Sequence, residues 1–178
     1  MIYQIAEDSY LLLKIIQERI PNLLNKNPNL KFLEIGSGSG IQLETALKSG
    51  IKKENIFSCD INTEAVKHCK KVGFNCIKSN LFEKIKGKFD LIVFNPPYLP
   101  EEKKEPRDSK LSTTGGKKGS ELINEFLRQA KKYLNKDGRI FLLTSNLTKG
   151  INFNNYKKKK IEGENLFFEK IFVWELRN

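Results

Sequence analysis

The alternation of short apolar runs with helix-like stretches is the feature that most constrains how this chain can fold. The predicted strands are residues 31–35, 55–60, 75–78, 89–94 and 139–145. Helical patterns separate most of them, and parallel neighbours need such crossover connections. We therefore expect an α/β fold with a doubly wound, mostly parallel sheet and helices on both of its faces.

The predicted helices have apolar residues at helical spacing and local end signals. They are residues 9–20, 41–48, 63–72 and 120–134. Pro21 is expected to end the first helix, and Gly73 is expected to follow the end of the third. Ser120 is expected to cap the start of the fourth.

The C-terminal part of the chain predicts an antiparallel hairpin. Residues 157–162 and the β-rich run 166–176 flank Gly163-Glu164-Asn165, which reads as a turn. Between Ser145 and Tyr156 the asparagine-rich sequence allows at most a turn. One face of the sheet is therefore expected to be less covered near the end of the chain.

A glycine turn follows the first predicted strand. Residues 36–40 read Gly-Ser-Gly-Ser-Gly and precede the helix predicted at 41–48. Glycines let the backbone pass close to a ligand, and a helix N-terminus offers free N–H groups. The layout is typical of a nucleotide-binding βα unit. Because position 41 is Ile, the dinucleotide fingerprint Gly-x-Gly-x-x-Gly is not met.

An acid lies where such units bind ribose. Asp60 ends the second predicted strand, about twenty residues beyond the glycine turn. The alternative is that Asp60 caps the helix beginning at Thr63, although Asn62 or Thr63 can also do so.

The tetrapeptide Asn95-Pro96-Pro97-Tyr98 comes directly after the strand predicted at 89–94. The prolines end that strand abruptly. The Asn95 amide and the Pro96 carbonyl could accept the two hydrogens of a planar NH2 group, while the Tyr98 ring packs on its flat face. The structural alternative is a Pro-Pro turn that only closes the strand.

In this order, these elements resemble the class I S-adenosylmethionine-dependent methyltransferases, and within them the HemK-like branch. That branch methylates the glutamine side-chain amide in the Gly-Gly-Gln motif of class 1 translation release factors. The segments that carry the resemblance are residues 3–13, with Ile5 where proline is usual, residues 33–40, residues 89–98 and the Gly-Gly-Lys-Lys-Gly loop at 115–119.

The resemblance covers residues 1 to about 145 and points to the compact archaeal–eukaryotic form. It implies one Rossmann-like domain over residues 1–178, with a seven-stranded sheet. Residues 1–22 would form a helical segment over the cofactor. Residues 100–119 form a polar loop long enough to read as a lid or substrate-docking segment.

The cofactor implied by the resemblance is S-adenosyl-L-methionine. Glu34 is expected to meet its amino group, Asp60 its ribose, and Asn80 the adenine, where the family often has an acid. The residues expected to contact the cofactor are Glu7, Asp8, Ser9, Glu34, Gly36, Gly38, Gly40, Asp60, Ile61, Asn80, Leu81 and Asn95. Asn95, Pro96 and Tyr98 are expected to be catalytic, and Pro97 is expected to join them in contacting the substrate.

Two other functions remain open at this point. An adenine-N6 methyltransferase acting on DNA or RNA would use the same tetrapeptide, since the exocyclic amine of a flipped adenine is also a planar NH2. The net charge of +11 favours a nucleic acid, a ribonucleoprotein or an acidic partner. However, the lysines are scattered except at residues 157–160. A non-catalytic cofactor-binding scaffold is the second alternative.

The remaining sequence features bear on the compartment of the protein and on the kinds of site that it can contain. There is no apolar run near twenty residues and no signal-peptide pattern, so we expect neither a membrane span nor secretion. Cys59, Cys69 and Cys76 lack the Cys-x-x-Cys spacing of a zinc site, so we expect no metal and a reduced, cytoplasmic protein. The single histidine gives no support for triad chemistry.

The resemblance also implies a protein partner, a small zinc-binding activator that adds a strand to the sheet. The short strand predicted at 75–78 reads as an edge strand, and an edge offers unpaired backbone groups to such a partner. Phe57 and Phe74 are expected to leave apolar area exposed nearby. The alternative is that the short length of this strand and Lys78 already protect the edge, so that the chain is active alone.

Overall fold

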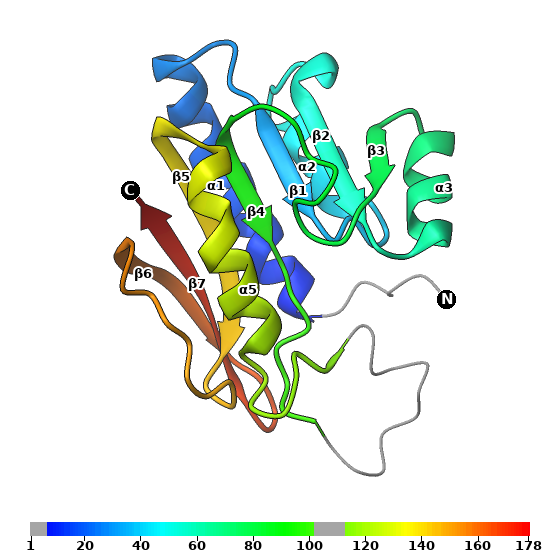
Figure 1. Ribbon diagram of the computed structural model, residues 1–178. Helices are drawn as coiled ribbons and strands as arrows, with labels where there is room; N and C mark the ends of the chain where they lie inside the picture. Colours follow the sequence, from blue (N-terminus) through cyan, green and yellow to red (C-terminus); the bar gives the residue numbers. More distant parts are fainter. Residues whose placement is uncertain (1–6, 102–112) are drawn as a thin grey trace.

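The computed structural model of the chain describes residues 7–101 and 113–178 and contains one seven-stranded sheet (Figure 1). The strands are β1 (Phe32–Ile35), β2 (Ile56–Asp60), β3 (Asn75–Lys78), β4 (Phe89–Phe94), β5 (Leu134–Ser145), β6 (Lys157–Asn165) and β7 (Lys170–Arg177). The helices are α1 (Glu7–Lys26), α2 (Ile41–Lys48), α3 (Thr63–Lys71) and α5 (Glu121–Ala130), with short 3-10 turns η1 (Lys53–Asn55) and η2 (Lys131–Tyr133).

The sheet order is β3-β2-β1-β4-β5-β7-β6. Strands β3, β2, β1, β4 and β5 are parallel, whereas β7 runs antiparallel to both β5 and β6. The strand order reverses at β1, which pairs with β2 on one side and with β4 on the other. Ligands of open α/β sheets bind at the carboxyl ends of the strands beside such a reversal. The predicted fold, including its C-terminal hairpin, is confirmed.

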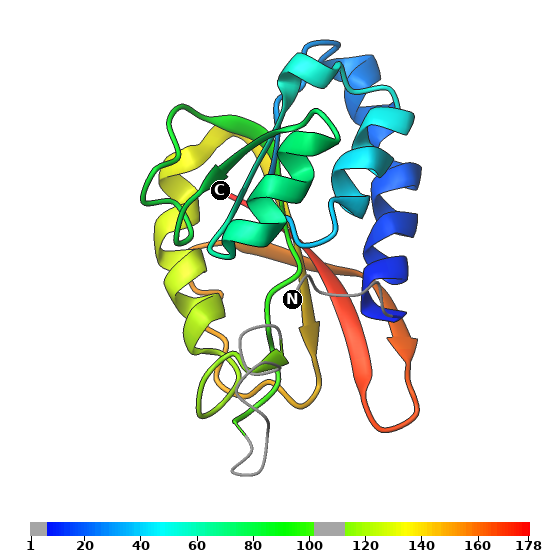
Figure 2. The ribbon, with the colours of Figure 1, turned by 90° about the vertical axis from the view of Figure 1, so that its right-hand side faces the viewer.

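Helices cover both faces of the sheet. Helix α1 lies beside α2 on one face, and α5 lies on the opposite face (Figure 2). Phe126 of α5 packs on Phe94, the last residue of β4, with ring centroids 4.6 Å apart. Both side chains are buried, so this contact fixes the end of β4 immediately before Asn95.

The first helix corrects one prediction. Pro21 does not end it, because α1 continues to Lys26 with Pro21 inside. A proline removes one backbone donor but need not stop a helix that has enough packing. Here Ile20 and Leu23 on either side of Pro21 are buried in the core, and their packing carries the helix past it.

The helix predicted at 120–134 is shorter than expected, and its predicted cap is wrong. Helix α5 ends at Ala130. The Ser120 hydroxyl makes no cap; it donates to the Lys149 carbonyl at 2.6 Å. The Glu121 carboxylate accepts from the Lys118 N–H instead, at 3.1 Å. A tertiary contact to the segment after β5 has therefore displaced the local cap.

The C-terminal strands also differ in extent from the prediction. Strand β5 begins at Leu134, so Gly138 lies inside it rather than in a turn, and the pairing with β4 is irregular at that end. In the hairpin, Gly163 pairs with Phe172 within the ladder, and the turn is formed by residues 166–169. No helix forms between β5 and β6 in this described segment, as expected.

Strand β3 is an edge strand, as predicted. The exposed apolar area expected beside it is smaller than predicted. Phe74 is buried, with the Lys53 ammonium 5.4 Å from its ring centroid. Phe57 is half-buried and packs edge-on against Phe89. Over the described residues, no helix has the length and apolar character that a membrane crossing requires.

Candidate active site

The glycine turn between β1 and α2 is tied to the neighbouring strand β2. The N–H groups of Gly36 and Ser37 both donate to the Cys59 carbonyl, at 2.8 and 3.1 Å. Gly36, Gly38 and Gly40 have φ values of 74°, 48° and 80°. This left-handed region suits glycine, which explains the Gly-x-Gly-x-Gly spacing.

Asp60 supports the same turn from the end of β2. Its Oδ2 accepts from the Gly38 N–H at 2.9 Å, and its Oδ1 accepts from the Asn62 N–H at 2.8 Å. The cap of α3 is Asn62, whose side chain accepts from the Glu64 N–H at 2.9 Å. Asp60 is therefore not the cap, and its carboxylate lies at the turn where a ribose is expected.

Glu34 in β1 is a buried acid that lacks a hydrogen-bond partner for one of its carboxyl oxygens. Its side chain is 1% exposed, and its Oε2 atom has no hydrogen-bond partner. Burial raises the pKa of Glu34 well above its usual range, and the nearby Asp60 carboxylate and Cys76 raise it further. An unpartnered buried carboxyl is costly, so an incoming ammonium group would satisfy it.

The residues expected at the adenine end lie around the β2 and β3 ends. Ile61 is 51% exposed, which leaves an apolar side chain free to pack on a planar ring. Asn80 is exposed, and its Nδ2 donates to Glu83 at 3.2 Å. Leu81 has a φ of 46°, the only positive value of a non-glycine residue in the described ranges. Such strain gathers at ligand sites.

Asn95 is held in one orientation by a residue far away in sequence. Its Nδ2 donates to Asp8 Oδ2 at 3.2 Å, while its Oδ1 is buried and has no partner. Asp8 also accepts from the Ser9 N–H at 2.6 Å at the start of α1. Within residues 7–101 and 113–178, no backbone N–H donates to the Pro96 carbonyl. Asn95 Oδ1 is thus unpartnered, and no backbone donor occupies the Pro96 carbonyl, the other predicted acceptor.

The glycine loop before α5 packs closely against the rest of the tetrapeptide. A Cβ atom on Gly115 would lie 2.5 Å from the Pro97 carbonyl oxygen, and one on Gly119 would lie 2.3 Å from that of Tyr98. Thr148 also donates to the Tyr98 carbonyl at 2.8 Å. The Tyr98 side chain is only 8% exposed and belongs to the core, so less of its ring face is open than we predicted.

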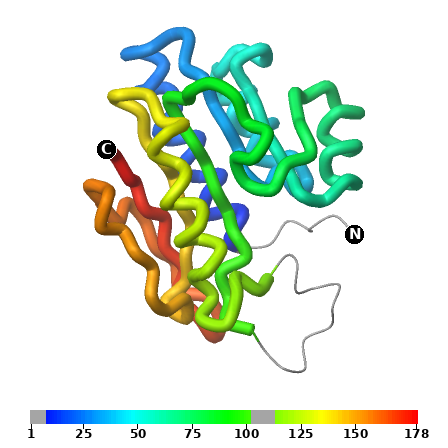
Figure 3. Tube along the Cα trace, viewed as in Figure 1, coloured from blue at the N-terminus to red at the C-terminus, as the bar shows by residue number. Residues whose placement is uncertain are grey.

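Glu169 was missed by the sequence analysis. It is 8% exposed, its Oε2 has no partner, and burial raises its pKa, with further contributions from Asp8. Glu34, Asn95 and Glu169 hold all the unpartnered buried side-chain atoms of the described residues, and they lie along one edge of the sheet. In Figure 3 the start of α1, the segment after β4 and the turn before β7 gather at that end. No local pattern marks Glu169, because the hairpin brings it there.

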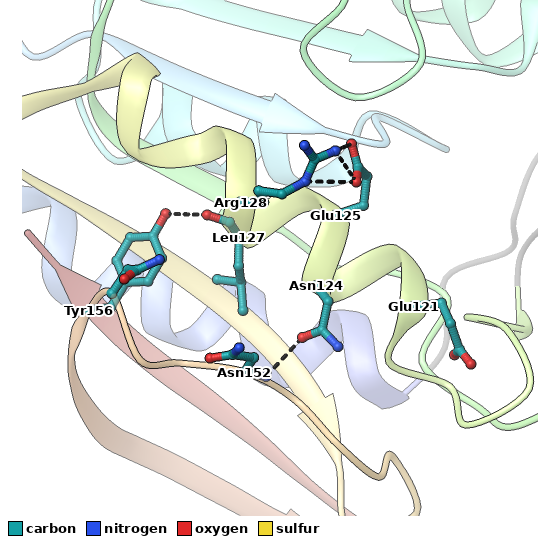
Figure 4. Close-up of a pocket in the computed structure, with 8 residues that line it drawn as sticks. Glu121, Asn124, Glu125, Leu127, Arg128, Asn152 and Tyr156 are labelled. Carbon is teal, nitrogen blue, oxygen red and sulfur yellow. Dashed lines mark hydrogen bonds and ion pairs between the residues drawn. The ribbon is translucent and has the colours of Figure 1, made fainter.

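A cavity of about 540 Å³ lies elsewhere, between α5 and the segment before β6 (Figure 4). Its polar groups are largely paired with one another. Tyr156 donates to the Leu127 carbonyl at 2.7 Å, Asn152 N–H donates to Asn124 at 2.8 Å, and Arg128 pairs with Glu125. We therefore place the candidate site at the strand ends and not in this cavity.

Two predicted parts of the site fall outside the described residues. They are residues 3–6 of the N-terminal segment and residues 102–112 of the predicted lid. The backbone of Glu7 begins α1, and Asp8 and Ser9 are buried there.

Comparison with protein families gives one match over most of the chain. The model of the methyltransferase small domain matches residues 7–153. A Methanocaldococcus jannaschii protein named as a protein N5-glutamine methyltransferase is 42% identical over 83% of this chain and 74% of its own length. Mouse methyltransferase HEMK2 is 32% identical over 80% of this chain and 71% of its own.

Comparison with solved structures supports the same fold. A chain of the E. cuniculi Mtq2–Trm112 complex, which is responsible for methylation of the termination factor eRF1, has a TM-score of 0.73. The match covers 99% of this chain and 98% of that one at 22% identity. A ribosomal protein L11 methylase from Lactobacillus delbrueckii has a TM-score of 0.63 at 18% identity, covering 100% of this chain and 82% of its own.

Proposed function

Because the chain belongs to the methyltransferase small-domain family, we propose that it methylates the side-chain amide nitrogen, N5, of a glutamine. The acceptor would be the glutamine of the Gly-Gly-Gln motif in a class 1 translation release factor. The observation that carries this proposal is Asn95, whose Oδ1 is buried, unpartnered and oriented by Asp8. The name of the Methanocaldococcus jannaschii relative supports glutamine as the acceptor. A Schizosaccharomyces pombe relative is named as the catalytic subunit of an eRF1 methyltransferase, which supports a release factor as the substrate.

The residues at the strand ends fit the cofactor S-adenosyl-L-methionine, which supplies an electrophilic methyl group when bound. The unpartnered Glu34 Oε2 would receive its ammonium group. Asp60 would bind the ribose while it holds the Gly38 N–H. Ile61 offers an exposed apolar surface to the adenine, beside Asn80. Asp8 and Ser9, at the start of α1, would close the methionine end.

The acceptor amide needs orientation more than it needs a base. An amide nitrogen is a weak nucleophile because its lone pair is delocalised, and positioning alone can contribute about 7–11 kcal/mol. Asn95 Oδ1 and the Pro96 carbonyl would accept its two hydrogens and hold the nitrogen in one direction. Their dipoles also favour the positive charge that develops on this nitrogen.

An adenine amine would satisfy the same two acceptors, so one experiment must compare the substrates. Purified protein with labelled cofactor would be offered a release factor, the same factor with its motif glutamine changed to alanine, single-stranded RNA and DNA. Label in the first protein alone, located on the glutamine by mass spectrometry, is the expected result. Label in nucleic acid only would establish the adenine alternative. Cofactor binding without transfer to any of the four, both with and without the activator proposed below, would support the scaffold alternative.

We also propose a small zinc-binding activator as partner, added at the edge strand β3. Its support is the free edge of β3 and the likeness to the Mtq2–Trm112 complex. Phe57 beside this edge is half-buried and could be covered further. Co-elution of the two proteins and higher activity in the mixture are expected. Full activity of the chain alone, without co-elution, would contradict the partner.

We also propose how the chain is organised. Residues 1–178 form one methyltransferase domain, in which residues 1–22 cover the cofactor and residues 100–119 act on the substrate side. The single sheet and its continuous core support one domain. The cytoplasm is our proposed compartment, and the three free, buried cysteines agree with a reducing environment.

A further inference from the structure

The outer part of the sheet carries lysines and aromatic rings on one face. Strand β6 contributes Lys158 and Lys160, and β7 contributes Phe172 and Trp174. Phe153, from the segment before β6, packs on Trp174 with ring centroids 5.0 Å apart. We call these residues, together with Lys170 at the start of β7, the lysine–aromatic face.

The ammonium groups lie over the rings in repeated contacts. Lys160 Nζ is 3.6 Å from the Phe172 ring centroid and 5.1 Å from that of Trp174. Lys158 Nζ is 4.8 Å from the Phe153 ring centroid. Lys170 Nζ is 5.9 Å from that of Phe172. The lysine ammonium groups therefore lie beside the aromatic rings. One ligand could contact the rings and the ammonium groups together.

The register explains why these residues share a face. Lys160 pairs with Trp174, so their side chains point to the same side of the sheet. Lys159 pairs with Glu175 and points to the other side. Trp174 is also fixed in orientation, because its indole N–H donates to Thr144 in β5 at 2.9 Å.

No helix covers this face in the part of the chain that the structure describes. Helix α5 lies over the neighbouring strands, as Figures 1 and 2 show, and residues 146–156 form no helix. The side chains of residues 157–160 are all exposed. Phe172 and Trp174 are half-buried, which suits a rigid surface for stacking.

We propose that the lysine–aromatic face binds single-stranded nucleic acid. Bases would stack on Phe172 and Trp174, and the lysines would pair with the phosphates. Stacking on aromatic side chains and backbone neutralisation by cations are the two features of such sites. Exposed cation–π contacts are weak, so Lys158 and Lys160 can leave the rings when a base and its phosphate arrive. The net charge of +11 favours a polyanion over the whole surface.

The chain offers a direct probe, since Trp174 is its only tryptophan. Titration with an oligouridylate of about twelve nucleotides should quench Trp174 fluorescence to saturation, because a stacked base quenches indole. Three lysine–phosphate contacts predict that log Kd rises with log salt at a slope of about 2, at about 0.7 for each contact on a single strand. These readouts need no methyl transfer, so they stand or fail separately from the proposed function.

Alternate residues of β6 provide a matched pair of variants. The double change Lys158→Ser/Lys160→Ser removes two charges from the face, and Lys157→Ser/Lys159→Ser removes two from the opposite side of the same strand. Anisotropy of a labelled oligonucleotide should show that the first lowers the salt slope by about 1.4 and weakens binding. The second double variant should keep the wild-type quenching of Trp174 fluorescence. It should also lose much less affinity for the oligonucleotide than the first double variant. All four lysines are exposed, and thermal melting would verify that both variants fold.

Three results would overturn the proposal. One is an equal loss in the two double variants, which would mean diffuse charge attraction. Another is quenching of Trp174 by polyglutamate as strong as that by the oligonucleotide, which would assign the face to an acidic protein. The third is wild-type protein that does not quench with any single strand at low salt.

Discussion

The Asn95 side-chain nitrogen donates a hydrogen bond to Asp8 Oδ2 at 3.2 Å, which ties the end of β4 to the start of α1. A carboxylate can only accept, so this bond fixes which end of the Asn95 amide is the nitrogen. The oxygen is thereby directed away from Asp8 and has no partner. The helix that is proposed to close over the cofactor thus also orients the acceptor for the substrate.

Replacement of this amide should separate catalysis from cofactor binding. Asn95→Ala should lower the rate of methyl transfer by about 10²-fold or more, as when a preorganised polar group is lost from an active site. Affinity for the demethylated cofactor should be nearly unchanged by calorimetry. Asn124→Ala, at the cavity on α5, is the matched control and should keep the rate. Equal loss of binding and rate in Asn95→Ala would make Asn95 structural.

Removal of the Asp60 carboxylate should weaken cofactor binding. The Asp60→Ala variant lacks the hydrogen bond from the Gly38 N–H and the proposed hydrogen bond from the ribose. Each hydrogen bond to a charged group contributes about 1.5–3 kcal/mol. The expected rise in the Kd of Asp60→Ala is therefore about tenfold or more.

Asp90→Ala provides the control for Asp60. Asp90 accepts from the Lys31 N–H at 2.8 Å and from Asn135 at 2.7 Å, at the opposite edge of the sheet. This variant should lose stability but keep the cofactor affinity. A wild-type Kd in Asp60→Ala would remove the ribose role.

The buried Glu34 carboxyl should make stability and cofactor binding respond oppositely to pH. Its pKa is raised in the folded chain, so the folded state binds more protons than the unfolded state once pH exceeds the usual glutamate range. The free energy of unfolding should then fall as pH rises, by about 1.4 kcal/mol per pH unit, until pH passes the raised pKa. Cofactor affinity should rise over the same window, because the ionised form pairs with the ammonium group.

Glu34→Gln checks both slopes. Urea denaturation from pH 5 upward should show the wild-type decline, and the variant should lack this contribution. Calorimetry should show a weaker Kd with less dependence on pH. A variant that binds the cofactor as tightly as the wild type at high pH would exclude Glu34 as the ammonium partner.

The Tyr156 hydroxyl anchors the segment before β6 to α5. It donates to the Leu127 carbonyl at 2.7 Å, and burial raises the pKa of Tyr156 to about 12. Tyr156→Phe should lower the free energy of unfolding by about 1 kcal/mol. Tyr133 makes a longer bond to the Phe82 carbonyl, at 3.3 Å, and is half-buried, so Tyr133→Phe should cost less. The reverse order in urea denaturation would contradict this account.

The elements with strong local end signals could be predicted from the sequence. The helix at 41–48 and the strand at 89–94 have the predicted bounds, since glycines or prolines mark their ends. Pro21 and Ser120 behave differently because distant contacts outweigh the local rule. Pro21 lies in a helix held by core packing, and the Ser120 hydroxyl is used by Lys149.

Part of the candidate site could also be predicted, because the ends of the strands are marked in the sequence. Glu34 lies one residue before the end of β1, Asp60 ends β2 and Asn95 follows β4, and parallel strands bring their carboxyl ends to one edge. The bond between Asp8 and Asn95 joins residues 87 positions apart, and no local pattern encodes it. Glu169 reaches the edge only through the hairpin, and the burial of Tyr98 depends on the whole core.

The position of β7 between β5 and β6 has a consequence for synthesis of the chain on the ribosome. Strand β5 is made first, and its residues Ile140, Phe141, Leu142 and Leu143 are fully buried in the finished sheet. Until Lys170–Arg177 have been made, this apolar strand has an open edge. Unpaired apolar edges invite association with other chains. The nascent protein is therefore exposed to aggregation in the interval between the emergence of β5 from the ribosome and the emergence of β7.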